Sequence, residues 1–430
     1  MIGIAADDVT GANDIGIMYA KAGLVTDVYS YNGLEPLVMA SHPDVLVLDT
    51  DSRFLPGKTA YELVYQAVKE LEQAGCTRFY NKTCSVFRGN IGAEFDAMLD
   101  ALGEDFAVVV LGFPKNGRTT IDGIHYVRGR KLEDSEFRND PMHPMTQSNL
   151  AEILQAQTRR KVAVLSYETI RKGPVALREE IGRMRSQCSY LILDVENQQS
   201  LEVIAEAVED ERVLAGSSAL AEELAKRLAV SGRQEGEQTF EPAPMRKETG
   251  ILCTAGSLMP QTAEQIAFLQ KEGNPSYKLD TRKLFDRLHR EELIAWLTEA
   301  IVSDLLTGRD VLLYSANEPQ EVALTKAEGA GRGLSSADVS RLVSTSLAEV
   351  TAQVLARTGQ TRLLVAGGDT SASLCARLGI RGMRVWKEIE PGLPSCLSLT
   401  GGSPLLLVLK SGSFGKPDFF KQAYAHLKSN

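Results

Sequence analysis

The sequence predicts an α/β protein of two domains, each a mostly parallel sheet flanked by helices, with the active site in the interdomain cleft. Three observations predict this fold class. Short apolar runs alternate with amphipathic stretches, and the chain of 430 residues exceeds what one compact domain usually holds. The alternation also stops at a polar, glycine-rich stretch and then restarts. We therefore expect domains at 1–230 and 248–430, joined by a linker at 231–247.

The elements of the first domain follow from hydrophobic patterning. Buried strands are predicted from short apolar runs at Ile2–Ala6, Val45–Asp49, Val108–Gly112, Val162–Leu165 and Tyr190–Asp194. Helices are predicted from amphipathic spacing at Ala60–Ala74, Glu94–Leu102 and Ala219–Val230. Parallel sheets bind ligands beyond the carboxyl ends of their strands, so the polar residues after each strand are the candidates for function.

The second domain repeats the alternation. Strands are expected at Gly250–Thr254, Tyr277–Leu279, Asp310–Tyr314, 363–366 and 405–409. Helices are expected at Pro260–Lys271, Arg290–Thr307 and Ser335–Thr358. This order again favours a parallel sheet with helices on both faces.

Composition excludes several classes of protein. The formal charge of −9, from 56 acidic and 47 basic residues, argues against nucleic acid as the main partner. No apolar run is long enough to span a bilayer and no basic region precedes the first strand, so we expect a cytoplasmic protein without a membrane partner. Six cysteines without a C-x-x-C pair and five histidines without ligand spacing predict neither a zinc site nor a disulfide framework.

Three strands of the second domain end in turns of small residues. These turns are Thr254-Ala255-Gly256-Ser257, Gly367-Gly368-Asp369-Thr370-Ser371 and Lys410-Ser411-Gly412-Ser413-Phe414-Gly415-Lys416. Glycine lets backbone N–H groups close on an anion, and a helix that begins there adds its positive end. The turns predict a nucleotide phosphate site, with ordinary strand-to-loop turns as the alternative. No P-loop or dinucleotide-binding fingerprint is present, which disfavours both of those sites.

Acidic residues follow two strands of the first domain. Asp7 and Asp8 come directly after the first strand, and Asp49, Asp51 and Arg53 stand at the end of the second. Such carboxylates can hold substrate hydroxyls, ligate Mg²⁺ or accept a proton. The alternative is that Asp8 only caps the helix that follows.

Basic residues follow two further strands. Lys82 and Arg88 bracket the segment 81–90, and Lys115 and Arg118 lie in 113–119. Arginine offers a planar fork and lysine a point charge, so such residues can clamp a carboxylate, although they also suit solvated loops. The first domain thus offers acidic side chains that can bind hydroxyls and basic side chains that can bind a carboxylate. Together they suit a small polyhydroxy acid as the ligand.

The order of these motifs resembles that of the four-carbon acid sugar kinases, which phosphorylate threonate, erythronate or their 3-oxo derivatives with ATP. The resemblance covers nearly the whole chain. Its motifs are Ala6-Asp7-Asp8-Val9-Thr10-Gly11-Ala12, Asp51-Ser52-Arg53, Phe113-Pro114 through Gly117-Arg118-Thr119 to Asp140-Pro141, Gly216-Ser217-Ser218, Ala255-Gly256-Ser257, Gly367-Gly368-Asp369-Thr370 and Lys410-Ser411-Gly412-Ser413-Phe414-Gly415.

The resemblance implies that the first domain binds the sugar acid and that the second binds ATP, with Mg²⁺. The expected nucleotide contacts are Ser257, Gly367, Gly368, Asp369, Thr370 and Gly412. The residues expected to face the sugar acid are Asp7, Asp8, Arg53, Lys82 and Arg88. We expect Asp8, with Asp369 as second choice, to orient the acceptor hydroxyl or take its proton. The partners are then small molecules, and a homodimer is one option for the assembly.

Two departures from the family pattern leave the substrate open. The family usually reads Lys-x-Asp-Ser-Thr-Leu-Arg-Gly-Asn, whereas here Cys84 replaces the aspartate and Val86 the threonine. Losing a carboxylate and a hydroxyl changes which substrate hydroxyls are satisfied, which shifts specificity. A kinase for a different small hydroxy acid and a non-catalytic sensor of nucleotide and sugar acid are the alternatives. A dehydrogenase is disfavoured because the dinucleotide fingerprint is missing.

Overall fold

The computed structural model describes residues 1–39, 41–140, 142–230, 249–401 and 404–430. The predicted linker at 231–247 lies outside the described residues, as does Pro141. The chain divides into two compact units, Met1–Gly236 and Glu237–Asn430, and both are α/β. In the part of the chain that the structure describes, no helix is both long and apolar enough to cross a membrane.

The first unit is built on a parallel sheet in the order β2-β3-β1-β4-β11-β5-β10-β9. Its strands are β1 (Ile2–Ala6), β2 (Thr26–Ser30), β3 (Val45–Asp49), β4 (Arg78–Lys82), β5 (Ala107–Val110), β9 (Val162–Leu165), β10 (Tyr190–Leu193) and β11 (Val213–Gly216). The register pairs Ala6 with Asp49 on one side and with Lys82 on the other, and pairs Lys82 with Gly216. Four central strands therefore end at the same level, and the residues after them lie side by side.

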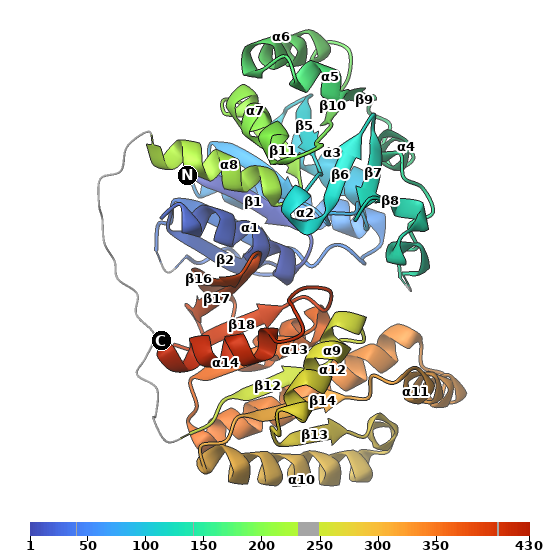
Figure 1. Ribbon diagram of the computed structural model, residues 1–430, viewed down its shortest axis with the longest axis vertical. Coiled ribbons are helices and arrows are strands. Elements are labelled where there is room, and N and C mark those ends of the chain that lie inside the picture. The colour runs from blue at the N-terminus through green and yellow to red at the C-terminus, as the bar shows by residue number, and fades with distance from the viewer. Residues whose placement is uncertain (40, 141, 231–248, 402–403) are drawn as a thin grey trace. The chain divides into compact units, whose positions relative to one another are not determined.

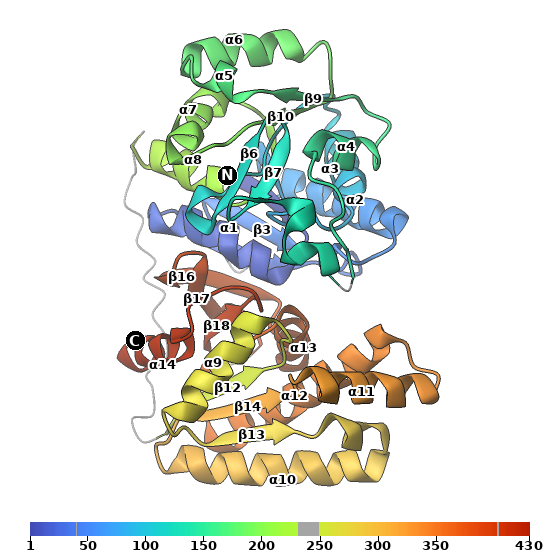
Figure 2. The same cartoon turned by 45° about the vertical axis from the view of Figure 1, so that its right-hand side comes forward.

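Helices cover both faces of this sheet, as right-handed crossovers require (Figures 1 and 2). One face carries α1 (Val9–Lys21), α6 (Pro174–Met184), α7 (Gln198–Val208) and α8 (Ala219–Val230). The other carries α2 (Gly57–Gln73) and α3 (Ile91–Leu102), and two shorter helices are α4 (Leu150–Gln155) and α5 (Tyr167–Ile170). The chain leaves β1 and β11 toward one face but β3 and β4 toward the other, the arrangement in which parallel sheets bind ligands beyond their strand ends.

A small antiparallel sheet of short strands follows β5. It consists of β6 (Arg118–Ile121), β7 (Ile124–Val127) and β8 (Arg130–Lys131). The apolar pattern did not predict this sheet, because its strands are short and lack an apolar run. A 3₁₀ turn, Pro114–Asn116, connects β5 to β6 and ends at Gly117, whose φ of 68° is left-handed.

The second unit has a parallel sheet in the order β13-β14-β12-β15-β18, which continues with antiparallel β17 and β16. The strands are β12 (Leu252–Ala255), β13 (Ser276–Leu279), β14 (Val311–Ser315), β15 (Arg362–Ala366), β16 (Gly382–Glu390), β17 (Leu393–Ser398) and β18 (Leu406–Lys410). The prediction of two mostly parallel α/β units is confirmed.

The helices of the second unit fall into two packed groups (Figure 1). The first comprises α9 (Pro260–Lys271) and α14 (Phe419–Ser429), and the second α10 (Arg287–Leu306), α12 (Ser336–Thr358) and α13 (Gly368–Leu378). Helix α11 (Pro319–Gly331) packs on α12. Fully buried Phe419 and Phe420 of α14 join Ile266 of α9 in an apolar core with the strands. The sheet is thus covered by amphipathic helices whose apolar sides the sequence pattern located.

Candidate functional site

The polar residues predicted for the first unit meet at the tips of its four central strands. Asp7 and Asp8 follow β1, Arg53 lies in the loop after β3, and Lys82 ends β4. Ser217 and Ser218 follow β11. The shared register brings together residues that are more than two hundred positions apart in the sequence.

Arg53 ties the tips of β1 and β3 together. Its Nε and Nη2 donate to the two carboxylate oxygens of Asp7, at 2.7 and 2.8 Å, and its Nη1 donates to Asp8 Oδ2 at 2.6 Å. The side chain is buried, so these charge-assisted bonds compensate a charge removed from water. Each of the three nitrogens of Arg53 donates to a protein carboxylate, so the residue holds the site together, and its predicted contact with the sugar acid stays a prediction.

Asp8 caps helix α1, as the alternative interpretation expected. Its Oδ1 accepts the Gly11 backbone N–H at 2.8 Å, and its Oδ2 accepts the Thr10 hydroxyl at 2.9 Å. Burial alone would raise the pKa of Asp8, but the Arg53 and Lys82 charges lower it to about 2. Asp8 is therefore ionised at neutral pH and a weak base, a state that suits it to orienting a hydroxyl.

Lys82 and Asp14 keep polar atoms that the protein does not satisfy. Lys82 is buried and its Nζ donates to the Thr83 carbonyl at 3.1 Å; within the described residues it makes no ion pair. A side chain on Gly11 would place a Cβ 2.8 Å from this Nζ, so glycine is needed there. Asp14 Oδ2 accepts the Ser218 hydroxyl at 2.5 Å, whereas its buried Oδ1 meets no donor among the described residues. Burial raises the pKa of Asp14.

Arg88 is balanced by an aspartate far away in sequence. Its Nη1 donates to Asp140 Oδ2 at 2.6 Å, its Nε to Cys84 Sγ at 3.3 Å, and its guanidinium lies 5.3 Å from the centre of the Phe137 ring. Burial would raise the pKa of the Cys84 thiol, but Arg88 and Arg53 lower it overall. The departure at Cys84 therefore places a polarisable thiol among arginines, where the family has a carboxylate.

Glu94 is a buried acid near the site. The sequence predicted that it lies in a helix but gave no sign of a role in the site. Its Oε1 accepts the Ser52 hydroxyl at 2.8 Å, and burial together with the charge of Asp7 raises its pKa to about 8. An acid in the first turn of a helix is an ordinary sequence feature, because it faces the positive end of the dipole. No local signal distinguishes this one.

In the second unit the three predicted turns converge. A Cβ built on Gly412 would lie 2.1 Å from Ser257 Oγ, and one on Gly256 would lie 2.2 Å from Thr370 Oγ1. Gly367, with a φ of 123°, would bring its Cβ 3.1 Å from the Ser257 nitrogen. The loops after β12, β15 and β18 thus pack so closely that side chains are excluded at these glycines.

The convergent turns present unused backbone donors. Helix α13 begins at Gly368, which leaves the N–H groups of its first turn, Gly368, Asp369 and Thr370, without intrahelical acceptors. Among the described residues, the N–H groups of Ser257, Gly412 and Ser413 also meet no protein acceptor. Such a group of donors at a helix start is an anion cradle. Asp369 is exposed beside it and accepts the Ser340 hydroxyl at 3.1 Å.

Lys410 shapes one of these turns from within. The residue is fully buried, and its Nζ donates to the carbonyls of Ser411, Gly412 and Phe414 at 2.8, 3.2 and 3.0 Å. The Thr262 hydroxyl lies 3.1 Å from the same Nζ. Burial lowers the pKa of Lys410 to about 7. These bonds fix the carbonyl groups of the loop around the lysine.

Few side chains of the described residues are placed to bind a metal ion. In the described ranges, no group of three or more His, Cys, Asp and Glu residues is arranged to hold a metal ion. Mg²⁺ usually binds through one or two carboxylates plus substrate phosphates, and Asp369 is the carboxylate next to the anion cradle.

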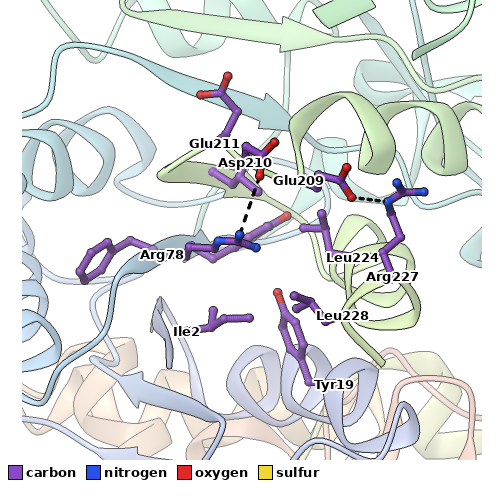
Figure 3. Close-up of a pocket in the computed structure, with 12 residues that line it drawn as sticks. Ile2, Tyr19, Arg78, Glu209, Asp210, Glu211, Leu224, Arg227 and Leu228 are labelled. Atoms are coloured by element: carbon purple, nitrogen blue, oxygen red, sulfur yellow. Dashed lines mark hydrogen bonds and ion pairs between the residues drawn. The ribbon is translucent and has the colours of Figure 1, made fainter. Parts of the chain in front are cut away.

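A cavity of about 140 Å³ lies at the opposite edge of the first unit's sheet. Ile2 and Arg78, which begin β1 and β4, line it, and its rim carries the ion pairs Arg78–Asp210 and Arg227–Glu209 (Figure 3). Because it opens at the amino ends of the strands, it is separate from the polar tips.

Comparison with known proteins agrees with this division of the chain. A family model described as a sugar-binding N-terminal domain matches residues 2–224, and one described as a nucleotide-binding C-terminal domain matches residues 252–420. A curated 3-oxo-tetronate kinase of Actinobacillus succinogenes is 33% identical over 98% of this chain and 99% of the relative. One of Haemophilus influenzae is 33% identical over the same shares of the two chains. A crystal structure of a Salmonella typhimurium protein, described as a candidate tRNA synthase, aligns with a TM-score of 0.84 and 29% identity over 99% of each chain.

The buried Glu94 predicts a pH-dependent stability. Because folding raises the pKa of this carboxyl from 4.5 to about 8, the folded state favours its neutral form. Stability from this group is full below pH 4.5 and is lost as pH rises toward 8, at ~1.4 kcal/mol per pH unit at most. Glu94→Gln should therefore gain stability relative to wild type across this range, measured by urea unfolding. The exposed Glu202→Gln is the control, and a pH-independent difference for Glu94→Gln would contradict the assignment.

Proposed function

The chain belongs to the four-carbon acid sugar kinase family, and from this premise we propose that it uses ATP to phosphorylate a threonate-, erythronate- or 3-oxo-tetronate-type acid. The protein is a kinase that acts on a sugar-acid hydroxyl. The observation that carries the choice of a nucleotide is the cradle of unused N–H groups at Ser257, Gly368–Thr370 and 412–413. We assign residues 248–430 to nucleotide binding and 1–230 to the sugar acid.

The proposed mechanism relies on positioning and charge, as phosphoryl transfer does in general. Asp8, which is ionised and held by Arg53, orients the acceptor hydroxyl, and Lys82 contacts the sugar acid with its unpaired ammonium group. The Asp7–Arg53 pair and Arg88 form the wall of this site.

The nucleotide half of the site depends on backbone groups. Ser257, Gly367, Gly368, Thr370 and Gly412 surround the phosphates, because small residues let the main chain approach. Mg²⁺ bound with the nucleotide would neutralise part of the phosphate charge. Asp369 is the residue that would hold the Mg²⁺ ion. Asp369 stays the second candidate for the residue that orients the hydroxyl.

The defining experiment measures ADP release with Mg-ATP against both threonates, both erythronates and their 3-oxo forms. Release that depends on one acid supports the kinase and identifies its substrate. Nucleotide binding without release for any acid would favour a sensor or a kinase for another hydroxy acid, which the changes at Cys84 and Val86 make worth testing.

Asp8→Asn tests the orienting role. Asparagine is as good a helix N-cap as aspartate, so α1 keeps its start while the negative charge is lost. We expect kcat to fall by roughly a hundredfold or more and ADP affinity to stay near wild type. Circular dichroism checks the fold, and wild-type turnover in the variant would remove Asp8 from the mechanism.

Lys410→Met tests the internal clamp of the nucleotide loop. Methionine fills much of the same space but leaves the carbonyls of Ser411, Gly412 and Phe414 without their donor. We expect ADP to bind about tenfold more weakly, since the loop loses its fixed shape, while sugar-acid binding is unchanged. Lys271→Met, at the exposed end of α9, is the matched control. Unchanged ADP affinity in a folded Lys410→Met protein would contradict this role.

A further inference from the structure

Arg118 is placed next to the strand tips by backbone geometry. It begins β6, and its backbone forms a pair of hydrogen bonds with Phe113, which follows β5, at 2.8 and 3.0 Å. The 3₁₀ turn between them closes through left-handed Gly117. The position of this side chain is therefore set by a short, rigid loop, as a preorganised binding residue requires.

The guanidinium of Arg118 carries a charge that the protein leaves uncompensated. Its only hydrogen bond within the described residues runs from Nη1 to the Asn116 carbonyl at 2.8 Å, and its Nε is buried without an acceptor. No carboxylate of the described chain lies within ion-pair distance of it. Burial lowers the pKa of Arg118, the direction expected of a cation without a close partner. Arg118 is half-buried with its Nε fully enclosed, and a cation withdrawn from water without a partner is costly, so a bound anion would offset part of that cost.

The other arginines of this region are already committed. Each nitrogen of Arg53 donates a hydrogen bond to Asp7 or Asp8, and Arg88 is paired with Asp140. Arg88 and Arg118 both lie against the Phe137 ring, at 5.3 and 5.9 Å from its centre, so Arg118 belongs to the same cluster. Within the described residues, Arg88 has a carboxylate partner in Asp140, whereas Arg118 donates only to a backbone carbonyl.

Acceptors without donors accompany Arg118. Asp14 Oδ2 accepts the Ser218 hydroxyl beside the tip of β11, and Asp14 Oδ1 is buried with no donor among the described residues. The Thr83 hydroxyl, beside Lys82 in the sequence, is also buried without a partner there. Buried polar atoms are nearly always hydrogen-bonded, so a group of orphans of both kinds indicates a missing polar ligand.

We propose that Arg118 binds the carboxylate of the sugar acid and that Asp14 accepts a hydrogen bond from one of its hydroxyls. This inference rests on the proposed function, which it deepens by naming the group that selects an acid over an uncharged polyol. Arg118 supplies a planar pair of donors that matches a carboxylate, while Lys82 adds a second positive charge. The site then distinguishes four-carbon acids from polyols of the same length by charge.

The test compares binding of acids and polyols by titration calorimetry. Threonate and erythronate are the charged probes, threitol and erythritol the uncharged ones, and ADP the probe for a phosphate. Arg118→Gln should raise the Kd of the acid that wild type binds by roughly 100-fold. The affinities for polyol and ADP should stay unchanged. Arg118→Lys should recover part of the loss, and Arg130→Gln, an exposed arginine of the same small sheet, should lose nothing.

Thermal unfolding separates binding from a structural role. If Arg118 serves the ligand, Arg118→Gln without ligand should melt at or above the wild-type temperature, because an uncompensated charge has been removed. The rise in Tm that the acid produces in wild type should vanish. A large loss of apo stability in Arg118→Gln with acid affinity retained would overturn the proposal.

The remaining outcomes keep this inference distinct from the proposed function. Acid binding that ignores Arg118 overturns the inference alone, and a selective loss of ADP binding would assign Arg118 to the nucleotide phosphate instead. Acid binding that depends on Arg118, without ADP release for any acid, overturns the kinase proposal alone. If wild type binds neither threonate, erythronate nor their 3-oxo forms, both are wrong.

Discussion

The buried contact of Arg53 with Asp7 and Asp8 is the interaction on which the sugar-acid site depends. It joins the loops after β1 and β3, fixes the carboxylate that caps α1, and keeps Asp8 ionised. Removing one partner of such a buried pair typically costs about 3–5 kcal/mol, because the other charge is left unpaired. The same contact explains why Arg53 is a part of the framework although its residue type suits an anion.

The buried and half-buried cations of the two candidate sites divide by what balances them. Arg53 and Arg88 have carboxylate partners, and Lys410 is surrounded by carbonyls that it holds in place. Lys82 and Arg118 have no such partner in the described chain. At the strand tips, a bound anion would offset the cost of the second kind.

The two units solve the problem of binding an anion in different ways. The second unit uses backbone N–H groups at convergent glycine turns, and the buried Lys410 bonds to carbonyls of its own turn. The first unit uses side chains, which can be positioned separately around a small, chiral acid. Backbone donors suit a ligand common to a whole family, whereas side chains such as Cys84 and Val86 can change with the substrate.

The sequence by itself determined the fold class, most strand and helix positions and the loops that carry the site, because apolar periodicity and glycine turns are local signals. Strands Ile2–Ala6 and Val45–Asp49 and helix Pro260–Lys271 lie where the pattern predicts them. The polar strand β2 and the hairpin β16–β17 carried no clear signal. Only the tertiary structure decided which charged side chains are paired within the protein and which remain able to bind a ligand. Asp140 reaches Arg88 across fifty-two positions and Ser218 reaches Asp14 across two hundred and four, and no local pattern encodes such pairs.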